Sequence, residues 1–259
     1  MRLPDDNLRD IFQVWLRYFA VFRKSWMYGL MTTVTEPVLF LLAFGFGLGV
    51  MIEDLSHSGK VLSYRQFVFA GIVGQAVLLQ GFFEGAFGAF IRMYYQRVFQ
   101  SIAVTPITLS EVLWAEILWD STRGTFSATV ILAIGVATGS FDALGALLAI
   151  PICAMGSLLF SAIGVWCAAK SRTIEEINYP QFIFIYPMFL FGGVFFPLEN
   201  LPAWFQPVSM ALPLTGMVEA IRSVTLGLPF PWAGFAILVA WTLFSVPMAR
   251  AAMTKRLVP

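Results

Sequence analysis

The sequence predicts an all-α membrane protein with six transmembrane helices, and two observations support this fold class. The first is composition: 59% of the 259 residues are hydrophobic and 12% are charged, whereas soluble globular domains are about 45–50% apolar and about 25% charged. Mean hydropathy is correspondingly high, at +0.79. The second is a series of six apolar stretches, each about long enough to cross a hydrocarbon core of about 30 Å. These stretches lie near residues 27–51, 66–91, 112–138, 144–168, 179–197 and 231–250.

At this length we expect residues 1–259 to form a single transmembrane domain. The net charge of +1 gives no basic stripe of the kind that binds nucleic acid, so no nucleic-acid partner is expected. Cys153 and Cys167 fall in one apolar stretch, which is typical of small buried residues and not of metal ligands or a disulfide framework. Acidic residues stand where a cleavable signal peptide would need a basic region.

Before the first span, residues 7–24 predict an amphipathic helix. An aromatic and aliphatic face alternates with basic residues at helical spacing, and such helices tend to lie in the headgroup plane. The alternative is an ordinary amphipathic helix packed on protein, and we favour the interfacial interpretation. The apolar face consists of Leu8, Ile11, Phe12, Trp15, Phe19 and Phe22, with Arg9, Arg17, Arg23 and Lys24 interleaved.

After the fifth span, segment 198–226 is too interrupted to cross a membrane, since it contains Pro202, Pro207 and Pro213. We expect short re-entrant helices at the outer face, between spans five and six. Their backbone polar groups need protein or water partners, so this segment should pack against the bundle.

Lys and Arg are distributed unevenly between the two sides of the predicted bundle. Twelve of them lie on the side that holds both termini, while only Lys60, Arg65 and Arg222 lie on the other side. The positive-inside rule therefore places both termini in the cytoplasm.

The sequence contains no recognisable catalytic motif. A single histidine, His57, excludes the H-E-x-x-H zinc motif, and no G-x-S-x-G nucleophile elbow occurs. Lys24 and Lys170 each precede a serine, but neither follows a glycine, so there is no P-loop. We expect no catalytic residue, no metal site and no cofactor, and uphill transport would draw its energy from an ion gradient or another subunit.

Five ionisable residues fall inside predicted spans, where charge is costly and often functional: Glu36, Glu84, Glu116, Asp120 and Arg123. The last three share one helical face, and Asp120 and Arg123 are spaced for an intrahelical ion pair. One interpretation is a polar lining for a translocation path. The other is structural, with Arg123 neutralising Asp120 and Glu116 at the cytoplasmic interface. For Glu36 and Glu84 both interpretations remain open.

The connection between spans two and three, residues 92–107, combines arginines with aromatic residues and ends at a helix-start signal, Thr108. We expect a short helix on the cytoplasmic surface, followed by a turn. Such a helix could dock into a groove on a partner, and the alternative is a membrane-surface loop.

Three stretches, in this order, resemble the ATP-binding-cassette type-2 export permeases and, among them, the nodulation-factor-type lipo-oligosaccharide exporters. They are TEPVLFLLAFGFGLG in the first span, the run from Arg92 through FQSIAVTPIT, and GGVFFPLENLPAWFQPVSMALPLTGMVEAIR from Gly192 to Arg222. The third is the most specific, with a phenylalanine-proline end to span five, a Leu-Pro-x-Trp segment, a proline-led turn and a closing arginine. Its marker residues are Pro197, Trp204, Pro213, Glu219 and Arg222.

The resemblance implies a permease homodimer in the bacterial inner membrane, with two copies of a separate ATPase subunit that bind ATP and Mg. The substrate would be amphipathic: a lipid-linked saccharide, a lipo-oligosaccharide or a hydrophobic drug, exported between the two permeases. The resemblance also makes 92–107 the coupling segment that touches the ATPase, through Arg92, Tyr95, Arg97, Phe99 and Gln100. An ion-coupled transporter or channel that uses the intramembrane carboxylates is the alternative.

Overall fold

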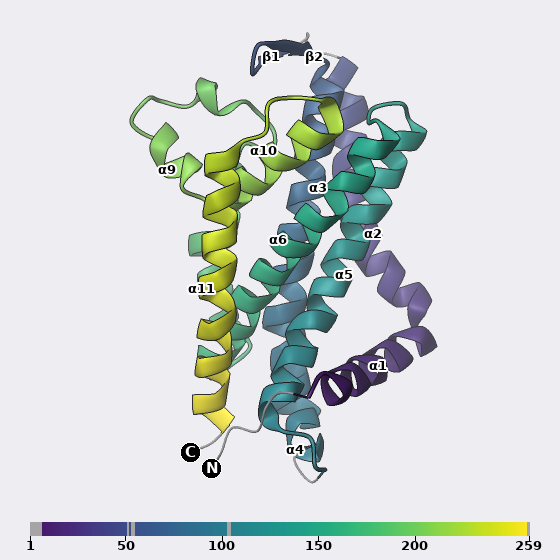
Figure 1. The fold of residues 1–259 in the computed structure, drawn as a ribbon, viewed down its shortest axis with the longest axis vertical. Helices are drawn as coiled ribbons and strands as arrows, with labels where there is room; N and C mark the ends of the chain where they lie inside the picture. Colours follow the sequence, from purple (N-terminus) through teal and green to yellow (C-terminus); the bar gives the residue numbers. More distant parts are fainter. Residues whose placement is uncertain (1–6, 51, 53–54, 103–104, 258–259) are drawn as a thin grey trace.

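The computed structural model describes residues 7–257 apart from 51, 53–54 and 103–104, and it is almost entirely helical (Figure 1). The side chains of Leu30, Thr32, Thr33, Val50, Gln100 and Leu257 also lie outside the described part. The α-helices are α1 (Leu8–Lys24), α2 (Trp26–Phe40), α3 (Tyr64–Phe83), α4 (Val98–Ile102), α5 (Leu109–Ala137), α6 (Ala143–Lys170), α7 (Asn178–Pro180), α8 (Tyr186–Phe191), α9 (Gln206–Met210), α10 (Pro213–Leu226) and α11 (Trp232–Leu257).

Shorter helical turns and one small hairpin complete the fold. The π-helical turns are η1 (Leu41–Gly47), η3 (Glu84–Gly88), η4 (Ile91–Tyr95) and η6 (Gln181–Ile185), and the 3-10 turns are η2 (Leu48–Val50), η5 (Glu175–Ile177) and η7 (Leu198–Asn200). Strands β1 (Leu55–His57) and β2 (Lys60–Leu62) pair antiparallel, with His57 opposite Lys60.

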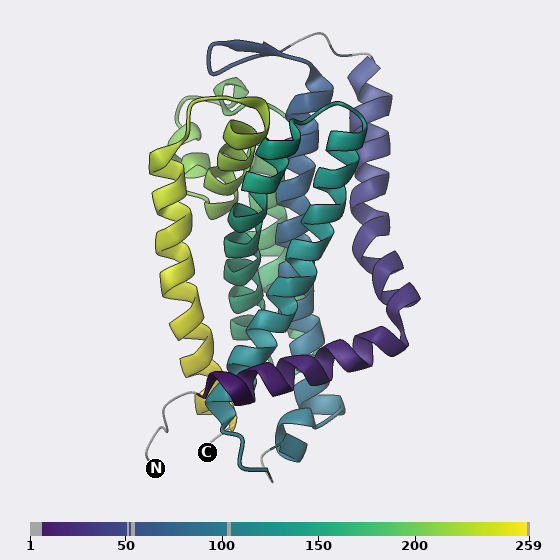
Figure 2. The ribbon, with the colours of Figure 1, turned by 45° about the vertical axis from the view of Figure 1, so that its right-hand side comes forward.

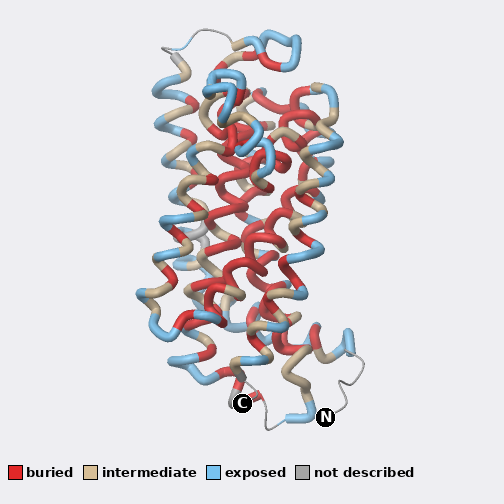
Figure 3. Tube along the Cα trace, turned by 90° about the vertical axis from the view of Figure 1, so that its left-hand side faces the viewer, coloured by how far each residue is buried: buried red, intermediate tan, exposed pale blue. Residues whose placement is uncertain are grey.

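The long helices run side by side, with α3, α5 and α6 in the middle and α2 and α11 at the edges (Figures 1 and 2). One end of the bundle carries α1, α4 and the last turn of α11, and we call it the α1 end. The opposite end carries the hairpin, and we call it the hairpin end. The buried residues form a continuous column through the central helices (Figure 3).

Helix α1 lies across the bundle and not along it (Figure 2). Asn7 caps its first turn by accepting from the backbone N–H of Arg9. Ile11, Val14 and Tyr18 are buried against the bundle, whereas Phe12 is 57% exposed. The predicted helix is therefore confirmed, and its exposed aromatic residues remain free to meet lipid.

Among the described residues, four helical segments are long and apolar enough to cross a membrane: Trp26–Gly47, Tyr64–Tyr95, Ala143–Lys170 and Trp232–Arg256. They correspond to the first, second, fourth and sixth predicted spans. Helix α5 is also long, at 29 residues, but its first half is charged, so composition alone does not mark it as a span.

The fifth predicted span, 179–197, is shorter in the structure than the sequence indicated. The helical stretch ends at Phe191, and Gly193 then adopts φ +73°, a left-handed conformation that suits glycine. Beyond this turn, η7, α9 and α10 form the expected series of short helices. Of these, α10 packs against α3, α6 and α11 at the hairpin end.

Candidate functional site

A network of five charged side chains lies in the half of the bundle near the α1 end. Glu116, Asp120 and Arg123 share one face of α5, because residues three or four apart in a helix are neighbours. Glu84 comes from η3 and Arg92 from η4, the two π-helical turns that continue α3. Such wide turns are frequent at functional sites.

Arg92 is the centre of this network. Its Nε donates to Glu116 Oε1 at 2.6 Å, and its Nη2 donates to Asp120 Oδ1 at 2.7 Å. Its Nη1 lies 3.7 Å from Glu84 Oε2, and Arg123 donates to the other oxygen of Glu84. The side chains of Glu116 and Asp120 are completely buried.

Gly88 makes this arrangement possible. The Arg92 side chain folds back along the π-helical turns towards Glu84 and passes over Gly88. A Cβ atom at position 88 would lie 3.0 Å from Arg92 Nη2 and 3.2 Å from Glu84 Oε2. A larger residue would therefore push apart the two partners of the ion pair.

The network contains two guanidinium groups and three carboxylates, so its formal charge is 2 − 3 = −1 when all five groups are ionised. Within the described part of the chain, Glu116 Oε2 and Asp120 Oδ2 accept no hydrogen bond. Buried charge is stable only when it is paired and hydrogen-bonded. These two oxygens are therefore places where a buried water or a proton could bind.

Helix α1 covers the network with aromatic side chains. The Tyr18 ring centroid lies 5.5 Å from the Cζ of Arg92, and the Phe22 ring centroid lies 5.4 Å from the Cζ of Arg123. Trp15 Nε1 also donates to Thr122 Oγ1 on α5 at 3.2 Å. The N-terminal helix is thus tied to the buried charges through cation–π contacts and one hydrogen bond.

These positions correct two interpretations made from the sequence. Asp120 pairs with Arg92 and not with Arg123, because Arg123 extends to Glu84 on the neighbouring helix. Arg92, assigned to the surface coupling segment, instead points inward and is part-buried. Glu36 is not part of the network and is exposed on α2.

The rest of the segment 92–107 divides into exposed and buried residues. Tyr95 is 61% exposed, and Arg97 is exposed with a left-handed φ of +50°. Phe99 lies in the five-residue helix α4 and is only 3% exposed. The side chain of Gln100 is outside the described part of the chain, and residues 103–104 are too. The accessible surface of this segment therefore includes the run of exposed residues 94–97, with Tyr95 and Arg97 among them.

A second polar cluster holds the hairpin end together. Arg222 on α10 is completely buried, and its Nη2 donates to the carbonyls of Gly193 at 2.6 Å and Val194 at 3.2 Å. The same guanidinium donates to the carbonyl of Phe67 on α3, and its Cζ lies 3.5 Å from that ring's centroid. Arg222 also donates to Glu219 Oε1 at 2.7 Å. This one side chain therefore joins α10, α3 and the turn after α8.

His57 connects the hairpin to this cluster. Its Nε2 donates to Glu219 Oε2 at 2.9 Å, and its Nδ1 lies 3.8 Å from Glu199 Oε1. Burial raises the pKa of Glu219, but Arg222 and His57 outweigh burial and lower this pKa to about 2. The carboxylate thus stays ionised and keeps both partners. We call His57, Glu219 and Arg222 the hairpin clasp.

Of the outer marker residues, only Glu219 and Arg222 belong to the clasp. Pro197 is buried beside the turn, and Pro213 begins α10, a position that suits proline. Trp204 is 77% exposed and stacks edge-on with Phe205. Trp204 is therefore available to meet lipid or another molecule.

Sequence reasoning missed two contributors. Tyr18 was not singled out, although it shares a helical face with Ile11 and Val14, and that spacing could have identified it. His57 was used only to exclude a zinc motif, and its position in a short hairpin gave no signal of a partner 162 residues away.

Residues 9–226, which include the network, the segment 92–107 and the clasp, match the family model of the ABC-2 type transporter. The chain belongs to the ABC-2 type transporter permease family. Permeases of this family lack an ATPase domain, in agreement with a sequence that has no P-loop. Membership implies a partner ABC ATPase subunit, and it makes this permease a multi-pass membrane protein.

The permease is similar to named relatives over most of its length. It is 28% identical to nodulation protein J of Rhizobium meliloti (strain 1021), over 95% of this chain and 93% of the relative. It is 30% identical to nodulation protein J of Rhizobium leguminosarum bv. trifolii, over 88% of this chain and 85% of the relative. It is 24% identical to the inner membrane transport permease YadH of Escherichia coli (strain K12), over 83% of this chain and 82% of the relative.

Proposed function

We propose that this permease exports an amphipathic substrate across the bacterial inner membrane, powered by ATP hydrolysis in a separate subunit. The observation that carries the proposal is the charged network centred on Arg92. It joins α1, α5 and the last turns before α4, and these turns lead directly to the exposed residues Tyr95 and Arg97. A movement at that surface would thus reach the interior of the bundle.

For the membrane topology, we propose six spans with both ends of the chain in the cytoplasm. Four spans are the long apolar segments, and the other two are α5 and the helical stretch through α7, η6 and α8. The charges of α5 support this assignment, because they are paired inside the bundle and do not face lipid. The stretch through α7, η6 and α8 gives weaker support, because its helix ends at Phe191. The turn held by Arg222 then continues the chain towards the hairpin end.

For coupling, we propose that residues 92–107 dock on the ATPase, with Tyr95 and Arg97 as the contacting side chains and α1 beside them. Phe99 and Arg92 would act from beneath, by holding α4 and the helix end in position. In a homodimer, each of the two permeases would dock one copy of the ATPase through this surface.

For the path, we propose that substrate passes between two permease copies, as a lipid-linked saccharide, a lipo-oligosaccharide or a hydrophobic drug. Exposed Glu36 on α2 supports this, because a carboxylate facing hydrocarbon is costly and one facing a shared polar path is not. Glu84, Glu116, Asp120 and Arg123 would lie behind that path and position the helices that form it.

An ion-coupled mechanism receives less support from these positions. A proton relay needs carboxylates in a connected series. Here Glu84, Glu116 and Asp120 are paired with arginines, and Glu36 stands apart from them. The pairing is typical of a structural network more than of a relay.

The deciding experiment is reconstitution of the permease with a candidate ABC ATPase in lipid vesicles. We expect the two proteins to co-purify and export to require hydrolysable ATP, even when the proton gradient is held at zero. A hydrolysis-deficient ATPase is the matched control. Export by the permease alone, driven by an ion gradient without nucleotide, would overturn the proposal.

A further inference from the structure

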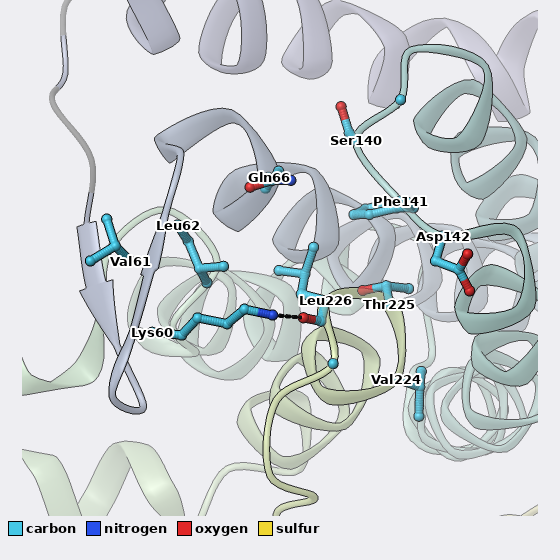
Figure 4. A pocket seen from close by; sticks show the side chains of 12 residues that line it. Lys60, Val61, Leu62, Gln66, Ser140, Phe141, Asp142, Val224, Thr225 and Leu226 are labelled. Atoms are coloured by element: carbon cyan, nitrogen blue, oxygen red, sulfur yellow. Dashed lines mark hydrogen bonds between the residues drawn. The ribbon is translucent and has the colours of Figure 1, made fainter.

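A cavity of about 580 Å³ opens at the hairpin end (Figure 4), and none of its lining residues belongs to the charged network. Four parts of the chain form its walls: β2, the start of α3, the turn between α5 and α6, and the end of α10. Its volume falls in the range of small-molecule sites. Its polar lining side chains are Lys60, Gln66, Ser140, Asp142 and Thr225.

The positive charge in this cavity belongs to Lys60, which is held at a helix end. Lys60 Nζ donates to the carbonyl of Leu226 at 2.8 Å. Leu226 is the last residue of α10, and the final carbonyls of a helix carry its partial negative charge. The ammonium group is thus fixed in place, and its remaining N–H groups can donate to a ligand (Figure 4).

The negative charge in the cavity belongs to Asp142, which is also held at a helix end. Asp142 is the N-cap of α6, and its Oδ2 accepts from the backbone N–H groups of Leu144 and Gly145, each at 3.1 Å. The first N–H groups of a helix carry its partial positive charge. Both cap bonds use the same oxygen, so Oδ1 can accept from a ligand.

Gln66 adds a neutral donor between these walls. Its Oε1 accepts from Ser63 Oγ at 3.1 Å in the capping box of α3. This bond holds the amide oxygen towards Ser63, so the Nε2 group points away from Ser63 and can donate to a ligand. The cavity therefore offers donors from Lys60 and Gln66 and an acceptor from Asp142.

We propose that this cavity binds a neutral polyhydroxylated group, chemically a saccharide. The lining carries one positive and one negative side chain, Lys60 and Asp142, so it has no net charge that would select an ion. Hydroxyl groups both donate and accept, so a polyhydroxylated ligand suits a lining that holds both the Lys60 donor and the Asp142 acceptor. The binding itself stands apart from the export proposal. Its role rests on that proposal, because the cavity would hold the polar part of the substrate at the outer face.

The test uses a fluorescent label at the rim of the cavity. Val61 is 69% exposed, while the natural cysteines Cys153 and Cys167 are 0% and 3% exposed, so Val61→Cys can be labelled selectively with bimane. The full-length protein is placed in lipid nanodiscs assembled with cholate, without any sugar detergent. Maltose is titrated first, then inorganic phosphate and phosphocholine separately.

We expect a saturable fluorescence change with maltose and none with phosphate or phosphocholine. Lys60→Met should weaken maltose binding by about tenfold or more, because a hydrogen bond from a charged donor is lost. Lys60→Arg, which keeps a charged donor, should recover much of the affinity. Asp142→Asn keeps the cap through its single amide oxygen but puts an N–H donor in the place of Oδ1, so it should weaken maltose binding by about threefold or more. Unlabelled buried cysteines in each variant verify that it is folded.

Three results would overturn the inference. Saturable binding of phosphate or phosphocholine without maltose would make the cavity an ion site. Equal maltose affinity in folded Lys60→Met would place the sugar elsewhere. No response to any probe would mean that the cavity binds no such group. ATP-driven export is measured separately, so its failure with intact maltose binding would overturn only the proposed function.

Discussion

The ring of Tyr18 lies over the guanidinium of Arg92, with 5.5 Å between the ring centroid and Cζ. This contact joins the helix that lies across the α1 end to the most buried charges of the bundle. Tyr18 is 5% exposed, so the contact is shielded from water, where a cation–π interaction is strongest. A change in the tilt of α1 would therefore disturb Arg92 and the two carboxylates that Arg92 holds.

Removing the Tyr18 ring should uncouple α1 from the network. We expect Tyr18→Ala to lower the free energy of unfolding by about 2 kcal/mol or more, whereas Tyr18→Phe keeps the ring and most of the stability. Thermal unfolding can be followed with a thiol-reactive dye, since Cys153 and Cys167 are buried until the bundle opens. A Tyr18→Phe variant as unstable as Tyr18→Ala would show that the ring is not the source of the stabilisation.

Removing Arg92 should be more damaging, because two buried carboxylates lose their partner. We expect Arg92→Ala to lower the free energy of unfolding by about 3–5 kcal/mol in the same thermal assay. Arg92→Lys should recover only part, since an ammonium cannot replace the fork that reaches both Glu116 and Asp120. The control is Arg9→Ala on the exposed face of α1, which should change little. Equal effects at positions 9 and 92 would contradict the assigned network.

Gly88→Ala tests whether the network needs a residue without a side chain. The added methyl group would crowd Arg92 Nη2, at 3.0 Å, so we expect a loss of about 1–3 kcal/mol although alanine favours helix. Gly47→Ala is the matched control, because the nearest atom to its Cβ would be 3.6 Å away. A Gly88→Ala protein that melts at or above the wild-type temperature would refute the crowding argument.

Substitutions in the segment after Arg92 should distinguish loss of ATPase docking from loss of thermal stability. Tyr95→Ala and Arg97→Gly remove exposed side chains, and glycine also suits the left-handed φ at position 97. We expect both to weaken ATPase association, measured by co-purification, with no loss of thermal stability. Phe99→Ala should instead lower the free energy of unfolding by about 3 kcal/mol, because the ring is buried. Full ATPase association in the double variant of positions 95 and 97 would exclude this surface.

The hairpin clasp should weaken in acid. The pKa of Glu219 is lowered from 4.5 to about 2 in the folded protein. A group with a lowered pKa stabilises the fold above its unfolded value, and this contribution is lost as pH falls from 4.5 to about 2. We expect the stability difference between wild type and Glu219→Gln to shrink over that range, in melting curves at stepped pH. Glu199→Gln, at an exposed carboxylate, is the control.

Local pattern was enough to predict the elements whose cause is local. The helix 7–24, the long apolar segments and the broken region after Pro197 all follow from spacing and composition. The partners of the charged residues do not. Asp120 and Arg123 are suitably spaced, yet the structure places Arg92 nearer to Asp120, since π-helical turns redirect that side chain. Long-range pairing depends on how helices pack, and no spacing along one helix contains that information.

The end of the fifth span illustrates the same limit. Its residues stay apolar through Phe196, so the pattern continues past the point where the helix stops. The turn forms because Arg222, about thirty residues later, binds the carbonyls of Gly193 and Val194. A sequence pattern shows where a helix could extend, but it does not show where a distant side chain captures its backbone.

Arg222 also has a mechanical consequence. Because one guanidinium bonds Phe67 of α3 and the turn at 193–194, these segments and α10 should travel together as a rigid lever. Bending would then concentrate in residues 227–231, the short connection that follows α10 and leads into α11. Any rearrangement that opens the hairpin end of the bundle should therefore bend at this connection.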